Sequence, residues 1–183
     1  MTATTVNTMM ALEMVTATMT ELFGLPAHPL LVHIPIILIP LAMTTALLAL
    51  VPRVRVLMLA LTAFFSVIGG VGILLAASTG EQFQEQVKKN GNALVRHHAE
   101  LGDAAQTPGV IFAVVAVIAL LIVMLRISTH PIAQKTRSRI SLPNWLATLT
   151  LVLTLLGGIW ATYAVVQAGH SGAKSVWQEQ LKK

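Results

Sequence analysis

The sequence predicts an all-α fold, an integral membrane four-helix bundle that forms a single domain over residues 1–183. The first observation is composition: 55% of the residues are hydrophobic, 10% are charged, and the mean hydropathy is +0.77. An ordinary soluble domain has about 25% charged residues. The second is a set of four apolar segments near the length of about 20 residues that crosses a bilayer. They span residues 30–51, 56–78, 109–125 and 145–166 and contain no Asp, Glu, Lys or Arg.

The segment before the first span, residues 1–27, predicts an interfacial element. Its first 23 residues contain no Lys or Arg and no convincing cleavage site, so they do not match a signal peptide. Apolar residues recur at near-helical spacing from Met10 to Phe23, with Glu13 and Glu21 elsewhere. This pattern is typical of an amphipathic helix that lies on the membrane surface.

The connection between the second and third spans, residues 79–107, is the only sizeable polar segment. GEQFQEQV favours a short helix, and NGN marks a turn. A second helix is expected from Ala93 into the third span, with Pro108 either in a first turn or at a kink of that longer helix. The second connection is therefore predicted to be short and helical.

Basic residues predict the orientation of the bundle. The connections after the first and third spans contain no acid and carry Arg53, Arg55, Arg126, Lys135, Arg137 and Arg139. The positive-inside rule makes both connections cytoplasmic, which places both termini and residues 79–107 outside the cytoplasm. This basic rim beside the lipid bilayer explains the net charge of +5, and no basic stripe with interleaved aromatic residues indicates a nucleic-acid partner.

Several chemistries are excluded by what the sequence lacks. Without cysteine there is no disulfide, thiolate metal site, cysteine-ligated iron–sulfur cluster or covalent haem attachment. No Walker loop, GxGxxG, HExxH or GxSxG motif is present. Ser171 next to His170 is no evidence for a hydrolytic dyad. A transporter is not indicated, because no ionisable residue lies near the midplane and no inverted repeat is evident.

Histidine is the residue type with the most informative distribution. With the predicted topology, five of the six histidines collect at the extracytoplasmic face: His28, His33, His97, His98 and His170. His130 lies at the other face. His33 is a few residues inside an apolar span, where a polar side chain indicates either a functional site or a hydrogen bond within the bundle.

Each candidate also has a structural interpretation. His33 could bond a loop carbonyl or a carboxylate such as Glu100, and Glu100 could also orient a metal-binding histidine. His170 follows the fourth span, where a helix C-terminus stabilises an imidazolium. We expect Asp103 to act as a cap or hydrogen-bonding group, and His97 to be solvated.

Three segments carry a resemblance to a known family. They are AHPLLVHIPIILIPLA, TGEQFQEQVKK with LVRHHAELGD, and LLGGIWATYAVVQAGHSGAKSVW. These resemble the signatures, HPxxVHxPI among them, of the bacterial four-span membrane protein family named DUF2231. The resemblance covers nearly the whole chain after Gly24 and implies a bacterial cytoplasmic (inner) membrane location. It carries the family's recurring histidines onto His28, His33, His98 and His170.

The same resemblance implies a redox role. The architecture is distantly similar to haem b membrane cytochromes, and some similar proteins are fused to Rieske-type ferredoxin domains. A b-type haem needs two imidazoles from facing helices and small residues against which the porphyrin can lie. We expect one haem near the outer face with His33 and His98 as axial ligands and His170 as the substitute. The glycines that would suit the porphyrin are Gly69, Gly70, Gly72, Gly157 and Gly158, although they equally suit close helix packing.

Three hypotheses for function follow. The first is a single-haem electron carrier between the quinone pool or a respiratory complex and an exported redox partner. The second is a non-catalytic accessory subunit of a larger membrane complex. The third is a transition-metal site built from His33, His98 and His170 with Glu100 or water. An electron carrier or accessory subunit is favoured over a stand-alone enzyme.

Overall fold

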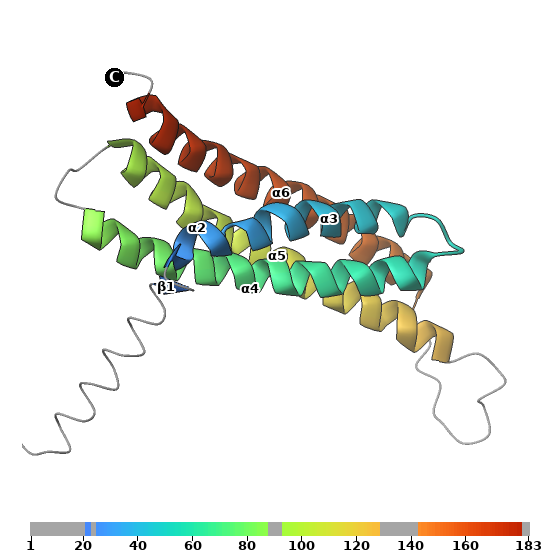
Figure 1. The fold of residues 1–183 in the computed structure, drawn as a ribbon. Helices are drawn as coiled ribbons and strands as arrows, with labels where there is room; N and C mark the ends of the chain where they lie inside the picture. Colours follow the sequence, from blue (N-terminus) through green and yellow to red (C-terminus); the bar gives the residue numbers. More distant parts are fainter. Residues whose placement is uncertain (1–20, 23–24, 88–92, 129–142, 181–183) are drawn as a thin grey trace, which may run out of the picture.

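Four long helices form the body of the protein (Figure 1). The computed structural model describes residues 21–22, 25–87, 93–128 and 143–180. The elements are β1 (Glu21–Leu22), β2 (Leu25–Pro26), α2 (Ala27–Leu31), α3 (His33–Leu48), α4 (Arg55–Val87), α5 (Ala93–Ser128) and α6 (Asn144–Gln180). The predicted all-α bundle is confirmed, with one small addition, because β1 and β2 form a two-residue antiparallel pair.

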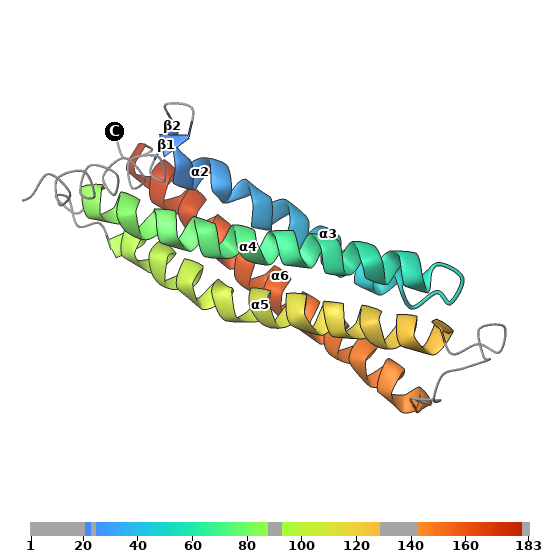
Figure 2. The ribbon, with the colours of Figure 1, turned by 90° about the horizontal axis from the view of Figure 1, so that it is seen from below.

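The helices form a ring in which each packs on its neighbour in sequence and α3 closes the ring against α6 (Figures 1 and 2). Successive helices run in opposite directions. One end of the bundle therefore gathers α2, the start of α5 and the ends of α4 and α6. We call this the histidine end, because His28, His33, His98 and His170 all lie on these segments or beside them.

Small side chains fill the interior, whereas large apolar side chains cover the outside. Most of the buried hydrophobic residues are alanine, and many Leu, Ile and Val side chains are exposed around the bundle. This distribution is typical of membrane helices, which use small residues to approach closely and present apolar bulk to lipid. Four helices are long and apolar enough to span a membrane: Ala27–Leu48, Arg55–Glu81, Ala93–Arg126 and Asn144–Gln178. The protein is a membrane protein with four candidate spans.

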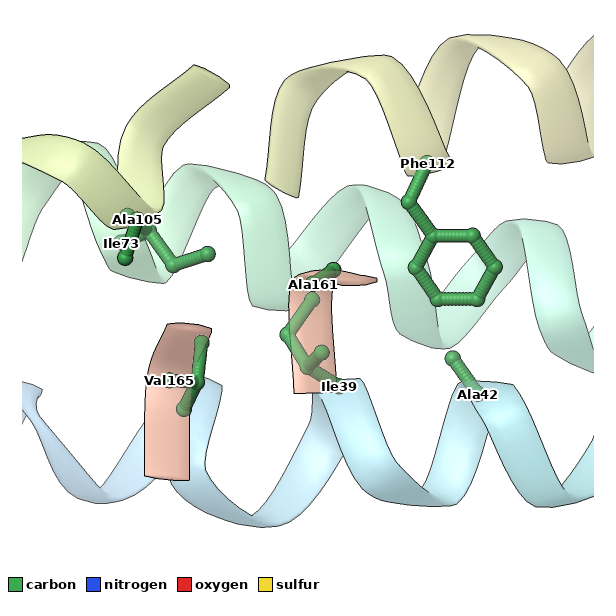
Figure 3. Close-up of a cluster of buried hydrophobic side chains, with 7 residues drawn as sticks. All are labelled: Ile39, Ala42, Ile73, Ala105, Phe112, Ala161 and Val165. Atoms are coloured by element: carbon green, nitrogen blue, oxygen red, sulfur yellow. The ribbon is translucent and has the colours of Figure 1, made fainter. Parts of the chain in front are cut away.

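Phe112 anchors the main apolar cluster (Figure 3). Its side chain on α5 is fully buried, and its ring lies over two consecutive glycines of α6. A Cβ built on Gly158 would lie 3.1 Å from Phe112 Cε2, and one built on Gly157 would lie 3.6 Å from Phe112 Cα. The glycines therefore allow α5 and α6 to pack closely. The other members of the cluster are Ile39, Ala42, Ile73, Ala105, Ala161 and Val165.

The glycines of α4 have the same packing role. A Cβ built on Gly69 would lie 2.8 Å from Ile39 Cδ1, and one built on Gly72 would lie 2.7 Å from Ile34 Cγ2. At Gly70 the nearest atom is the backbone oxygen of Gly109, 3.6 Å away. Isoleucine side chains and backbone therefore occupy the surfaces that could have received a porphyrin. Of the two roles considered for these glycines, the structure assigns helix packing.

The helices are longer than the predicted spans at the histidine end. The α4 helix continues through Gly80 to Val87, so the expected short helix in GEQFQEQV is an extension of α4 and not a separate element. The α5 helix begins at Ala93 and passes through the buried Pro108, as the longer of the two alternatives predicted. The predicted turn at NGN lies outside the described residues.

Prolines interrupt the first span at its start. Helix α2 ends at Leu31, Val32 keeps αR geometry, and α3 begins at His33. Pro35 has no N–H to donate to the carbonyl of Leu31, which explains why the two helices are not one. The predicted interfacial helix ending at Phe23 lies outside the described residues except for its last part, where Glu21–Leu22 form β1.

Polar contacts hold the opposite end of the bundle. The Arg55 Nε donates to the carbonyl of Ala49 at 3.1 Å, and this contact caps the last turn of α3. Arg126 near the end of α5 bonds the Asn144 side chain at the start of α6. Basic side chains thus link neighbouring helix ends at the end of the bundle that the positive-inside rule predicts to be cytoplasmic.

Replacing Phe112 with alanine should destabilise the bundle strongly. The change opens a cavity between α5 and the two glycines of α6, and we expect a loss of about 3–5 kcal/mol of unfolding free energy. Unfolding of the detergent-solubilised protein by sodium dodecyl sulfate, followed by tryptophan fluorescence, measures it. Leu121→Ala on the exposed face of the same helix is the matched control and should change stability by about 0.5 kcal/mol or less. Equal losses for the two variants would contradict the packing described here.

Candidate functional site

Two histidines from different helices meet at the histidine end. His28 lies in α2 and His98 in the second turn of α5, and both are half-buried. Their ring centroids are 5.9 Å apart, and the ring planes are inclined by 67°. Residues 70 positions apart in the chain thus form one imidazole pair inside the bundle.

His28 is held by α4. Its Nδ1 bonds the carbonyl oxygen of Ala76 at 2.8 Å. One turn further along, Gly80 leaves the space that the ring occupies, because a Cβ there would lie 2.9 Å from His28 Cε1 and 3.0 Å from Nδ1. Gly80 is therefore a site of close ring packing within α4.

His98 is held by α6 in the same manner. Its Nδ1 lies 3.0 Å from the carbonyl oxygen of Ala168 and 3.1 Å from the hydroxyl oxygen of Ser171. The Ser171 hydroxyl donates to the same carbonyl at 2.8 Å. A Cβ built on Gly172 would lie 2.9 Å from His98 Cε1. The ring is therefore fixed by two acceptors and by the absence of a side chain beneath it.

These partners determine which ring nitrogen carries the proton. A backbone carbonyl can only accept a hydrogen bond, so the Nδ1 of His28 and the Nδ1 of His98 must both be donors. In a neutral imidazole the other nitrogen, Nε2, then has a free lone pair. Hydrogen bonding of Nδ1–H to a carbonyl is the arrangement that commonly orients metal-binding histidines.

A cavity of about 1450 Å³ surrounds the pair. All the helices contribute to it, and its lining is mainly apolar, with Ile36, Ile73 and Val165 at its inner side. Its polar members are His28, His33, Glu81, His98, Asp103, Ser175 and Gln178. The volume exceeds the range of about 300–1000 Å³ typical of small-molecule pockets, so the cavity can receive a large ligand.

The other predicted site residues lie around this pair or away from it. His33 lines the cavity but is exposed, and its Nδ1 bonds the Pro29 carbonyl of its own segment at 2.7 Å. His170 is exposed and is not part of the cavity lining. The structure therefore brings His98 together with His28, whereas the sequence favoured His33 as its partner.

The acidic candidates face solvent. Glu100 lies 3.8 Å from Arg96 Nε and 3.9 Å from His97 Nδ1, and all three side chains are largely exposed. Asp103 lines the cavity and accepts a hydrogen bond from Gln106 at 3.2 Å. Among the residues that the structure describes, no group of three or more His, Cys, Asp or Glu side chains is placed to hold a metal ion. Among the described residues, the imidazoles that meet at this end of the bundle are those of His28 and His98.

The fold and the imidazole pair define a class, that of four-span membrane helix bundles with a histidine site at one end. A family model described as "Predicted membrane protein (DUF2231)" matches residues 24–183. The chain belongs to this family. Neither a curated protein nor a solved structure matches the chain.

Sequence reasoning missed the residues that hold the two rings. Ala76, Gly80, Ser171 and Gly172 are ordinary small residues, and nothing in their composition indicates a site. A signal was nevertheless present, because AASTG and AGHSG share the pattern Ala-x-x-(Ser/Thr)-Gly near the ends of the second and fourth helices. A search for internal similarity restricted to small residues would have found it.

Replacing each of the four predicted histidines with alanine should rank them by their contribution to the unfolding free energy. His28→Ala and His98→Ala each remove a hydrogen bond between helices and should lower the unfolding free energy by about 0.5–1.5 kcal/mol. His33→Ala and His170→Ala, which remove exposed side chains, should have smaller effects. Detergent-solubilised variants compared by the same denaturation assay measure this. A loss for His170→Ala as large as that for His98→Ala would contradict the assignment.

Proposed function

We propose that this protein binds one haem b at the histidine end, with His28 and His98 as the axial ligands, and that it carries electrons. The observation that carries the proposal is the pair of facing imidazoles whose Nδ1 atoms are both anchored to carbonyls of neighbouring helices. When bound, haem b would supply one-electron oxidation and reduction. The protein would supply the ligands, the enclosure and the fixed geometry.

The separation of the two rings supports this proposal. Metal–imidazole bonds are about 2.0 Å long, so two imidazoles on opposite sides of one ion have centroids about 6 Å apart. The observed separation is 5.9 Å. The spacing of the pair is therefore close to that of two imidazoles bound to a common ion, and the tautomer set by the carbonyls leaves both Nε2 lone pairs available.

The number of ligands favours haem over a bare transition metal. A protein-bound transition metal usually takes three or four side-chain ligands. The described residues offer two imidazoles here and no third His, Cys, Asp or Glu in a common group. A porphyrin brings four nitrogens of its own, so two protein ligands complete its iron site. The apolar lining and the volume of the cavity suit a macrocycle.

Exposed aromatic residues on α6 suggest where the site lies relative to the bilayer. Trp145, Trp160 and Tyr163 are all at least half exposed. At 1.5 Å per residue Tyr163 is about 27 Å from Trp145 along the helix. Aromatic side chains gather at the two membrane interfaces, and the hydrocarbon core is about 30 Å thick. The His98 partners at 168 and 171 would then lie just beyond the hydrocarbon, at the extracytoplasmic interface of the inner membrane.

This location suggests the class of electron partner. A haem at the extracytoplasmic interface could accept electrons from the quinone pool or from a respiratory complex in the same membrane. It could pass them to an exported redox protein, for which a Rieske-type domain is the candidate. The positive-inside rule supplies the orientation, since Arg53, Arg55 and Arg126 lie at the opposite end of the bundle.

A visible spectrum tests the proposal directly. The detergent-purified protein should give a reduced-minus-oxidised spectrum with a sharp α-band and a haem b pyridine haemochrome near one equivalent. His28→Ala and His98→Ala should each lose most of the bound haem, because one axial ligand is removed. His33→Ala and His170→Ala are the controls and should retain it.

Two other results would overturn the proposal. Loss of haem in His33→Ala but not in His28→Ala would restore His33 as the ligand. A colourless protein that is folded and metal-free, also after growth with added haem precursor, would leave an accessory subunit in which the imidazoles act only as helix clamps. The existing bonds from His28 to α4 and from His98 to α6 favour this as the second candidate.

The absence of cysteine allows a clean test of orientation. Val176→Cys at the histidine end and Val51→Cys at the opposite end are both on exposed positions. In spheroplasts, a membrane-impermeant maleimide should label Val176→Cys at once and Val51→Cys only after permeabilisation. The reverse order would contradict the proposed orientation and move the haem to the cytoplasmic side.

A further inference from the structure

Two five-residue segments contact the two histidines in equivalent ways. Residues 76–80 on α4 read AASTG, and residues 168–172 on α6 read AGHSG. In each, the alanine at the first position supplies the carbonyl that accepts from a histidine Nδ1. In each, the glycine at the fifth position lies under the Cε1 of the same ring.

The fourth position extends the correspondence. The Thr79 hydroxyl donates to the Ala76 carbonyl at 3.2 Å, and the Ser171 hydroxyl donates to the Ala168 carbonyl at 2.8 Å. Both side chains are almost completely buried, at 5% and 8% exposure. Alanine carbonyl, hydroxyl and glycine therefore recur in the same order around each imidazole.

Topology gives the two segments the same direction. Helices α4 and α6 both end at the histidine end, while α2 and α5 both begin there (Figure 2). Each of α4 and α6 packs against both α3 and α5. In this order of helices, a half-turn about the long axis of the bundle would bring α2–α4 to the place of α5–α6. The ring pair lies where the two halves meet, and each half supplies one imidazole.

We propose that residues 76–80 and 168–172 are a duplicated histidine cradle, which fixes both imidazoles with protonated Nδ1 and leaves both Nε2 atoms available to one shared ligand. Gly80, Gly172 and Ser171 are its positioning residues. The cradle extends the proposed function and rests on it in one respect, the identification of the shared ligand as haem. The hydrogen bonds and ring packing that define the cradle are independent of it.

The two halves differ in whether the hydroxyl group contacts the histidine Nδ1. The Ser171 hydroxyl oxygen is 3.1 Å from His98 Nδ1, so this N–H has two acceptors. The Thr79 hydroxyl instead donates to the carbonyls of Leu75 and Ala76, and the Nδ1 of His28 has the Ala76 carbonyl as its acceptor. An added acceptor on Nδ1–H increases the basicity of the ligating nitrogen. Removing Ser171 should therefore affect His98 alone.

The test uses the full-length protein with ¹⁵N-labelled histidine in detergent. Long-range ¹H–¹⁵N spectra of the dithionite-reduced sample report which ring nitrogen of each histidine carries a proton. The variants are Ser171→Ala, Ser171→Thr and Thr79→Ala, together with Gly80→Ala and Gly172→Ala. Gly102→Ala is the matched control, because this glycine lines the same cavity and an added Cβ meets nothing within 4 Å.

The wild type should show protons on Nδ1 and none on Nε2 of His28 and His98. Ser171→Ala should shift the His98 signals and leave those of His28 unchanged, and Ser171→Thr should restore them. Gly80→Ala should displace His28 alone and Gly172→Ala should displace His98 alone, while Gly102→Ala changes neither. In haem-loaded protein, Ser171→Ala should also raise the midpoint potential, because a less basic ligand stabilises the oxidised iron less.

Protons on Nε2 in the wild type would overturn the cradle, and so would unchanged His98 signals in both Ser171→Ala and Gly172→Ala. Failure of the proposed function is a separate result. A protein without haem that still has the expected protonation and variant responses keeps the cradle and refutes haem as its ligand. A haem-loaded protein whose ligand signals ignore these substitutions keeps the haem and refutes the cradle.

Discussion

The histidine end depends on one interaction made twice, a hydrogen bond from an imidazole N–H to a backbone carbonyl of a neighbouring helix. Such a bond needs the ring to lie flat on the helix surface, and only glycine leaves that space one turn beyond the acceptor. It also needs helices long enough to meet at this end of the bundle, where α4 continues to 87 and α5 begins at 93. The extra helical turns, the two glycines and the cavity follow from this requirement.

Much of the fold was readable from the sequence, because lipid imposes simple rules. A span of about 20 apolar residues without charge has few alternatives to a membrane helix. The ends of the helices were harder to predict. GEQFQEQV has good helix formers and no proline, and it was expected to form a short helix of its own after the second span. In the structure α4 is continuous through Gly80, and the His28 ring packs into the space that this glycine leaves.

The choice of partner for His98 could not be read from the sequence. His28 and His33 are close in the chain, and which of them faces α5 depends on the rotation of the first span about its own axis. That rotation is set by contacts such as Ile39 on Gly69 and Ile34 on Gly72, which are tertiary. The sequence favoured His33 because it lies deeper in the apolar run. In the structure His33 bonds its own segment at Pro29, whereas His28 lies against His98.

The packing below the histidine end has a consequence for energy conversion. The clusters around Phe112 and around Leu59 consist of apolar side chains in close contact, and the polar side chains buried among the described residues are Thr and Ser hydroxyls without charge. Under the proposed function, a charge taken up at the imidazole pair would meet no buried ionisable side chain of the described residues along the bundle axis. The proposed electron exchange would then take place at one surface, without drawing on the transmembrane voltage or adding to it.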